Sequence, residues 1–166
     1  IGIEQIHTRV THLTDWLLVE LGKCRHSNGR PIVEIYGPTT TKNRGGTIAL
    51  NFFTLDGDVV DERLVEQAAA RRNISLRTGC FCNPGGGEVA FELERQRLQG
   101  LKRVTARPYP NLDTLLQFMG ISSGGAIRVS IGAVSNFRDV ERFLAFARTF
   151  KDARPDASGM TPRTHC

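Results

Sequence analysis

Apolar residues recur near the start of the chain at the spacing of one face of a helix. The positions, three or four residues apart, are Ile6, Val10, Leu13, Leu17 and Leu21. This is the period of an amphipathic helix. The pattern stops at Leu21-Gly22, and a glycine often terminates a helix. It therefore predicts a first helix that ends near Gly22.

Four short segments are rich in β-branched and apolar residues and predict strands. They are residues 32–36, 46–53, 74–78 and 126–131. The first two are separated only by a polar, glycine-containing loop, so we expect them to pair antiparallel.

The later helices have recognisable starts. Asp61 can cap a helix, and Asn136 with Asp139 three residues on is typical of a capping box. Two further helices are expected over 88–103 and within 112–119. The order of elements predicts an α+β fold in which three to four strands form one sheet packed with helices.

Composition and charge are those of an ordinary globular domain. The 166 residues are 40% hydrophobic and 23% charged, with a formal net charge of +5. No apolar run approaches the ~18 residues of a membrane span, and the basic residues do not alternate with aromatic ones as on a base-stacking surface. We expect no membrane and no nucleic-acid partner. One domain is predicted over 1–150, followed by a loose tail over 151–166 that is rich in proline, serine, glycine and charge.

The cysteines favour a reducing compartment. They are Cys24, Cys80, Cys82 and Cys166. Cys80 and Cys82 are one residue apart, which is poor spacing for a disulfide and too short for a zinc-binding C-x-x-C pair. No secretion signal opens the chain. We therefore expect a cytoplasmic protein with free thiols and no metal site.

The segment 77–87 is the strongest candidate for chemistry. Its sequence, RTGCFCNPGGG, places two thiols on a glycine-rich loop directly after a predicted strand. Glycines give such a loop freedom to move, so a thiol on it can be brought to a substrate and withdrawn, as in a sulfur carrier. Arg77, or the start of the helix that follows, would lower the pKa of that thiol and make it nucleophilic. A glycine-rich turn with inert cysteines is the alternative.

Arg128 is the second candidate, because it interrupts an apolar strand. Alternation places Arg128 and Ser130 on one face and the apolar residues on the other. A guanidinium there can hold a carboxylate through two hydrogen bonds; a solvated strand face is the alternative. The segment 44–47 could bind an anion through backbone N–H groups, although such a sequence is more often a loop that enters a strand. His26 lies in a polar turn and is expected to be exposed.

The run 74–85, ISLRTGCFCNPG, closely resembles the cysteine loop of the molybdenum cofactor sulfurases. These enzymes belong, with the cysteine desulfurases, to the class V aminotransferase family of pyridoxal-phosphate enzymes. Arg44-Gly45-Gly46-Thr47, Asn51-Phe52 and the strand 127–132 support the resemblance and occur in the expected order. The likeness covers most of 1–150 and indicates the C-terminal small domain of a fold type I enzyme.

The resemblance implies a chemistry and its residues. Cys82 looks like the cysteine that forms a persulfide with sulfur taken from L-cysteine, with Cys80 as second choice. Arg128 resembles the arginine that binds the substrate carboxylate. The cofactor, pyridoxal phosphate, would be bound mainly by an N-terminal large domain of the same polypeptide, and full-length enzymes of this family are usually homodimers. No residue of this chain is assigned to the cofactor, so the chain alone is expected to be inactive.

Two departures keep other functions open. Gly86 and Gly87 stand where the sulfurases often carry a further cysteine, and the four lysines have no recognisable cofactor-lysine context. An aminotransferase, epimerase or lyase of the same class, acting on another amino acid with structural cysteines, is one alternative. A non-enzymatic sulfur-carrier or binding module is the other.

Overall fold

A computed structural model describes residues 2–79, 113–114, 116 and 123–161. In this part of the chain the elements are α1 (Ile3–Lys23), β1 (Val33–Tyr36), β2 (Thr47–Phe52), α2 (Glu62–Ala70), β3 (Arg77–Gly79), β4 (Ala126–Ser130) and α6 (Phe137–Arg148). Asp113, Thr114 and Leu116 are also helical, in agreement with the short helix expected there. The helix expected over 88–103 lies outside the described residues.

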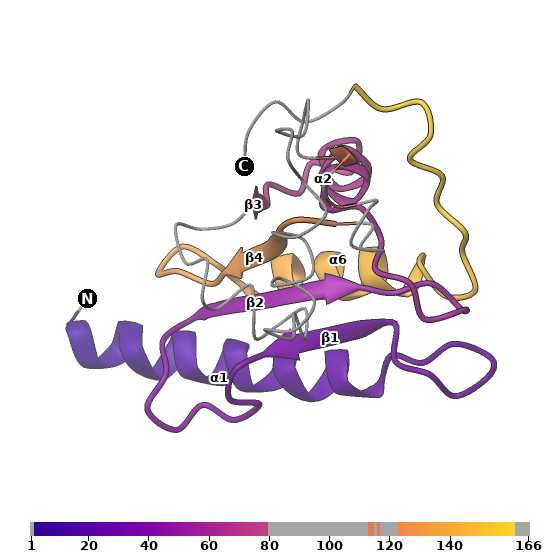
Figure 1. Cartoon of the computed structure of the whole chain (residues 1–166). Helices are drawn as coiled ribbons and strands as arrows, with labels where there is room; N and C mark the ends of the chain where they lie inside the picture. The colour runs from indigo at the N-terminus through magenta and orange to yellow at the C-terminus, as the bar shows by residue number, and fades with distance from the viewer. Residues whose placement is uncertain (1, 80–112, 115, 117–122, 162–166) are drawn as a thin grey trace, which may run out of the picture.

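The strands form one antiparallel sheet with the order β1-β2-β4-β3 (Figure 1). β1 and β2 pair antiparallel from Val33 opposite Phe52 to Tyr36 opposite Ala49, which confirms the pairing predicted for these two segments. β4 lies between β2 and β3 and pairs antiparallel with both. The strand that contains Arg128 is therefore a central strand, and β3, which leads to the cysteines, is its neighbour.

The described helices bury one face of this sheet. Ile48, Leu50 and Phe52 alternate along β2 and are each 0% exposed. The Phe52 ring lies 5.9 Å from that of Phe146 and 4.5 Å from that of Phe150. Buried residues of α1 and α2 join the same cluster. The predicted α+β class, with up to four strands packed against helices, is confirmed.

Both predicted caps are present. The Asp61 carboxylate accepts a hydrogen bond from the Arg63 N–H at the start of α2. At the start of α6, the Asn136 side chain accepts from the Asp139 N–H, and the Asp139 carboxylate accepts from the Asn136 N–H. This reciprocal pair satisfies donors that a helix start otherwise leaves open.

The strands expected over 32–36, 46–53 and 126–131 agree with β1, β2 and β4 to within one residue at each end. The two remaining differences have a physical cause. α1 continues through Gly22 to Lys23, since a glycine is tolerated in a helix when the chain does not need to turn there. The strand expected over 74–78 begins only at Arg77. The Ile74 N–H donates to the Ala69 carbonyl at the end of α2. Because this N–H is bonded to the helix, residue 74 does not take part in the sheet.

His26 is buried rather than exposed, which makes that prediction wrong. Its side chain is 0% exposed. Nδ1 accepts the Asp152 N–H at 2.9 Å, and Nε2 lies 3.0 Å from the Phe53 carbonyl. This pattern requires a neutral ring with its proton on Nε2. The Asp152 carboxylate also lies 3.5 Å from Nδ1.

The start of the segment after α6 is attached to the domain at several points. The Asp152 carboxylate accepts from the N–H of Ser27 at 2.9 Å, Arg154 lies 3.3 Å from Asp56, and Arg63 donates to the Thr161 carbonyl at 2.7 Å. In Figure 1 this segment is the yellow trace that runs from the end of α6 toward α2. None of the described helices is long and apolar enough to cross a membrane.

Candidate functional site

The sheet face opposite the helices is polar. The β2 residues between the buried apolar positions are Thr47, Ala49 and Asn51. Their direct cross-strand partners share this face, because paired residues point the same way. We call it the polar face; its residues are Glu34, Tyr36, Thr47, Ala49, Asn51, Arg77, Arg128 and Ser130. The prediction that Arg128 and Ser130 share one face of their strand is confirmed.

Arg128 lies in a row of residues that crosses the whole sheet. Its direct partners are Ala49 on β2 and Arg77 on β3. Tyr36 of β1 is the other partner of Ala49 and completes the row. Like charges directly opposite each other across two strands are unfavourable, and a carboxylate held between two guanidinium groups removes that repulsion. The row therefore has the chemistry of a carboxylate-binding site.

Asn51 connects this row to the start of β4. It is 0% exposed, and its Nδ2 donates to the Tyr36 hydroxyl at 3.2 Å and to the Gly125 carbonyl at 3.3 Å. Its Oδ1 has no hydrogen-bond partner among the described residues. Burial raises the pKa of Tyr36 to about 12, although the hydrogen bond from Asn51 opposes this shift. The Tyr36 phenol is therefore neutral at physiological pH.

Glycines allow β3 and β4 to approach closely where the cysteine loop begins. A Cβ on Gly125 would lie 2.9 Å from the Gly79 Cα, and Gly79 has a φ of +119°. Ser123 connects Gly125 to α2. Its hydroxyl donates to the Glu62 carboxylate at 2.6 Å and accepts from the Gly125 N–H at 3.4 Å. Cys80 directly follows Gly79 in the chain.

The predicted nucleophiles, Cys80 and Cys82, lie outside the described residues, as does Cys166. Cys24 is described and is a buried free thiol. Burial raises its pKa above the ordinary value of 9.0, which disfavours the thiolate that a nucleophile requires. Cys24 is therefore not a candidate for the sulfur-accepting residue.

Arg44 supports a loop rather than an open anion site. Its guanidinium donates to the carbonyl of Pro38 and to that of Thr47, the latter at 2.7 Å. A Cβ on the following Gly46 would lie 2.4 Å from the Ile131 carbonyl oxygen. The segment 44–47 thus packs against the end of β4 where the chain enters β2. This agrees with the alternative that the segment is a loop leading into a strand.

The described residues fit a substrate carboxylate better than they fit the cofactor itself. A pyridoxal-phosphate site needs a lysine to hold the cofactor. Of the described lysines, Lys23 bonds Glu20 on α1, Lys42 lies in the loop before β2, and Lys151 follows α6. None of these three is a residue of the polar face. Within the described part of the chain there is also no cluster of three or more metal-ligating side chains.

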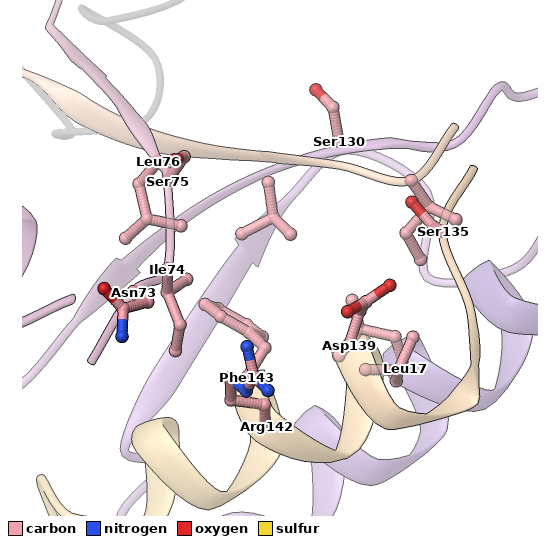
Figure 2. Close-up of a pocket in the computed structure, with 13 residues that line it drawn as sticks. Leu17, Asn73, Ile74, Ser75, Leu76, Ser130, Ser135, Asp139, Arg142 and Phe143 are labelled. Atoms are coloured by element: carbon pink, nitrogen blue, oxygen red, sulfur yellow. The ribbon is translucent and has the colours of Figure 1, made fainter. Parts of the chain in front are cut away.

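A concave region lies on the helix side of the sheet (Figure 2). It is a cavity of about 210 Å³ between residues 73–76, the end of β4 and the first turns of α6. Its lining combines apolar residues, among them Val140 and Phe143, with the charged residues Asp139 and Arg142. Among the described residues, its lining shares only Ser130 with the polar face.

Sequence reasoning located Arg128 but missed its surroundings. Tyr36 and the hydrogen bonds of Asn51 become part of the site only through strand pairing. The sequence contains a signal for this. Tyr36 and Asn51 belong to two segments predicted to pair antiparallel, and alternation along such strands can place both side chains on one face. Arg77 was considered only as a neighbour of the thiols, and its position opposite Arg128 follows from the sheet order.

No family model matches the chain, but curated relatives do. It is 34% identical over 150 residues to a molybdenum cofactor sulfurase of Drosophila mojavensis, covering 89% of this chain and 19% of the relative. It is 32% identical over 167 residues to that of Pyricularia oryzae, covering 95% and 19%. The relative from Botryotinia fuckeliana is 35% identical over 153 residues, covering 90% and 18%. The chain thus spans about a fifth of the length of these proteins.

Solved structures share the fold. The apo cysteine desulfurase of Thermococcus onnurineus superimposes with a TM-score of 0.56 at 18% identity, covering 90% of this chain and 26% of that one. A NifS-like protein of Rickettsia africae gives a TM-score of 0.50 at 16% identity, covering 91% and 30%. At these identities the likeness shows the fold alone. Together with the curated relatives, it confirms the resemblance to the molybdenum cofactor sulfurases and the cysteine desulfurases that the cysteine loop indicated.

Proposed function

We propose that this chain is the small domain of a pyridoxal-phosphate enzyme that takes sulfur from L-cysteine. The names of its relatives, molybdenum cofactor sulfurase, and of a structural neighbour, cysteine desulfurase, support this proposal. One observation carries the proposal. Arg128 of β4 lies on the polar face directly opposite Arg77 of β3, and β3 is the strand that leads to the two cysteines. The arginine proposed to bind the carboxylate therefore lies on the strand next to the one that Cys80 and Cys82 follow in the chain.

Arg128 would bind and orient the substrate. Its guanidinium would donate two parallel hydrogen bonds to the planar carboxylate of an amino acid. Arg77, on the same face, adds positive charge that favours the same anion. Cys82 follows Gly79 by three residues, a length of chain that spans at most about 11 Å, so its sulfur has the reach to meet a substrate held near this row.

Cys82 would accept the sulfur. Its thiolate forms an S–S bond with the substrate sulfur while the C–S bond of the substrate breaks, and the carbon fragment takes up a proton and leaves as alanine. The product on the protein is a persulfide. Bound pyridoxal phosphate would supply the electron sink for the substrate carbon atoms. Cys80 is the second choice for the acceptor.

The remaining parts of the site are assigned to the rest of the enzyme. The lysine that holds the cofactor would come from an N-terminal domain of the same polypeptide, because no described lysine is part of the polar face. We propose a homodimer for the full-length enzyme, and the cytoplasm as its compartment, since a persulfide chemistry needs reduced thiols. The domain would extend over 1–150, with 151–166 as its tail.

The proposal is tested by locating the persulfide. The full-length polypeptide is incubated with L-cysteine, and its cysteine peptides are analysed by mass spectrometry for an added sulfur atom. We expect the added sulfur on Cys82, loss of it in Cys82→Ala, and equal amounts of alanine and transferred sulfur. Cys24→Ala is the matched control and should retain the persulfide, since that thiol is buried on the helix side.

Two results would count against the proposal in different ways. A persulfide that persists in Cys82→Ala and disappears in Cys80→Ala would move the role to Cys80. Turnover of other amino acids, with no sulfur on either cysteine, would instead favour an aminotransferase, epimerase or lyase with structural cysteines.

A further inference from the structure

A second cavity lies where α1 and α6 both end, and its lining is strongly basic. Its volume is about 240 Å³, several times the ~30 Å³ that one water occupies in the liquid. Four cationic side chains line it: Lys23, Arg25, Arg148 and Lys151. Glu20 is the acidic residue in the lining, so its net charge is +3.

The single carboxylate is already shared by two of these cations. Glu20 lies 2.6 Å from the Lys23 ammonium and 3.4 Å from the Arg148 guanidinium. These contacts, the hydrogen bond from Lys23 first among them, hold the pKa of Glu20 below its ordinary value. Arg25 donates to the Cys24 carbonyl at 3.1 Å. Neither Arg25 nor Lys151 has an ion-pair partner within the described part of the chain.

Helix dipoles explain only part of this charge. Basic residues in the last turn complement the partial negative charge of a helix end, and Lys23 and Arg148 hold such positions in α1 and α6. Arg25 and Lys151 lie beyond the helices, yet they line the same cavity. Like charges this close repel within one Debye length, about 8 Å at physiological salt. Glu20 and the two helix ends offset part of this charge, and a bound anion would offset the rest.

We propose that this cavity binds a phosphate-sized oxyanion, either free phosphate or the phosphoryl end of a small phosphate monoester. Guanidinium and ammonium groups around a concave site are the usual ligands for such a group. Lys23 and Arg148 keep 65% and 57% of their side chains exposed, so the anion has access from solvent. The residues involved are helix ends and their flanks, none of them on the polar face, so this site is independent of the proposed sulfur chemistry.

The test is a titration of the full chain of 166 residues with inorganic phosphate, followed by NMR or calorimetry at constant ionic strength set with sodium chloride. We expect saturable binding that weakens about tenfold or more in the double variant Arg25→Gln/Lys151→Gln, since one lost charge-assisted hydrogen bond is worth at least that factor. Glu20→Gln removes the competing carboxylate and should strengthen binding.

The matched control is Arg138→Gln/Arg142→Gln, which removes the same charge from exposed positions of α6 outside the cavity. Phosphate binding should be retained there. Equal weakening in both double variants, or no saturation in the wild type, would mean diffuse attraction to a basic protein and would overturn the proposal. Methyl phosphate distinguishes a site for phosphate monoesters from a site for free phosphate. If it binds as tightly as inorganic phosphate, the site accepts monoesters. If it does not bind, the site is specific for the free anion.

Discussion

The two faces of the sheet differ in chemistry although they are built from the same strands. On one face Ile48, Leu50 and Phe52 are fully buried against the helices. On the other face, Thr47, Ala49 and Asn51 alternate along the same strand, and Ala49 pairs with Tyr36 and Arg128. The apolar face supplies most of the stability of the domain, and the polar face carries the side chains with binding chemistry. Substitutions on the apolar face should therefore change folding, whereas substitution of Arg128, or of an exposed residue of the polar face, should leave folding largely unchanged.

The largest effect on stability is expected for Phe52→Ala. This ring is 0% exposed and contacts both Phe146 and Phe150, and truncating a buried phenylalanine costs about 3–5 kcal/mol. Thr47→Ala, an exposed residue of the polar face on the same strand, should change the free energy of unfolding by less than about 0.5 kcal/mol. Urea unfolding measures both. Similar losses would contradict the division between the faces.

A smaller loss is expected for Gly125→Ala. The new methyl group would meet the backbone of Gly79 at 2.9 Å, and relieving such a contact costs up to about 3 kcal/mol. Gly132→Ala is the matched control, because nothing lies within 4 Å of its added Cβ. If the two variants unfold at the same denaturant concentration, the close approach of β3 and β4 is not required.

Asn51→Ala should cost about 2 kcal/mol, because two hydrogen bonds of a buried side chain are lost, each worth about 1 kcal/mol. Tyr36→Phe leaves the bond to the Gly125 carbonyl intact and should cost about half as much. Thermal unfolding compares them. A larger loss for Tyr36→Phe would show that Asn51 does not connect the polar face to the start of β4.

The smallest effect concerns Asp152, whose pKa lies below its ordinary value of 3.8, mainly because of the hydrogen bond from the Ser27 N–H. A carboxyl whose folded-state pKa is depressed stabilises the fold above its unfolded pKa, and this contribution is lost as the pH falls through the folded pKa. Asp152→Asn should therefore be less stable than the wild type at pH 7. The difference should shrink below about pH 4 and would be constant with pH if this account is wrong.

The sequence predicted most elements because local signals specify them. The spacing of Leu13, Leu17 and Leu21 indicated α1, and Asn136 with Asp139 indicated the start of α6. His26 was misjudged because its neighbours in sequence are polar, whereas the groups that bury and bond it, Phe53 and Asp152, are 27 and 126 residues away. Long-range contacts of this kind leave no periodic signal.

The candidate site was predictable in part for the same reason. Alternation within one strand was enough to place Arg128 on the face away from the core. That it stands opposite Arg77 depends on β4 lying between β2 and β3, an order that adjacent segments do not encode. The basic cavity at the ends of α1 and α6 likewise combines residues from both ends of the chain, Lys23 and Lys151 among them.

The most direct test of the polar face is the rate of alanine formation from L-cysteine by the full-length polypeptide carrying Arg128→Gln. Loss of a bidentate contact to the substrate carboxylate should lower kcat/KM about a hundredfold, largely through KM. Arg142→Gln, on the helix side, should retain the wild-type value. Equal kcat/KM for Arg128→Gln and the wild type would contradict the assignment of this face to substrate binding.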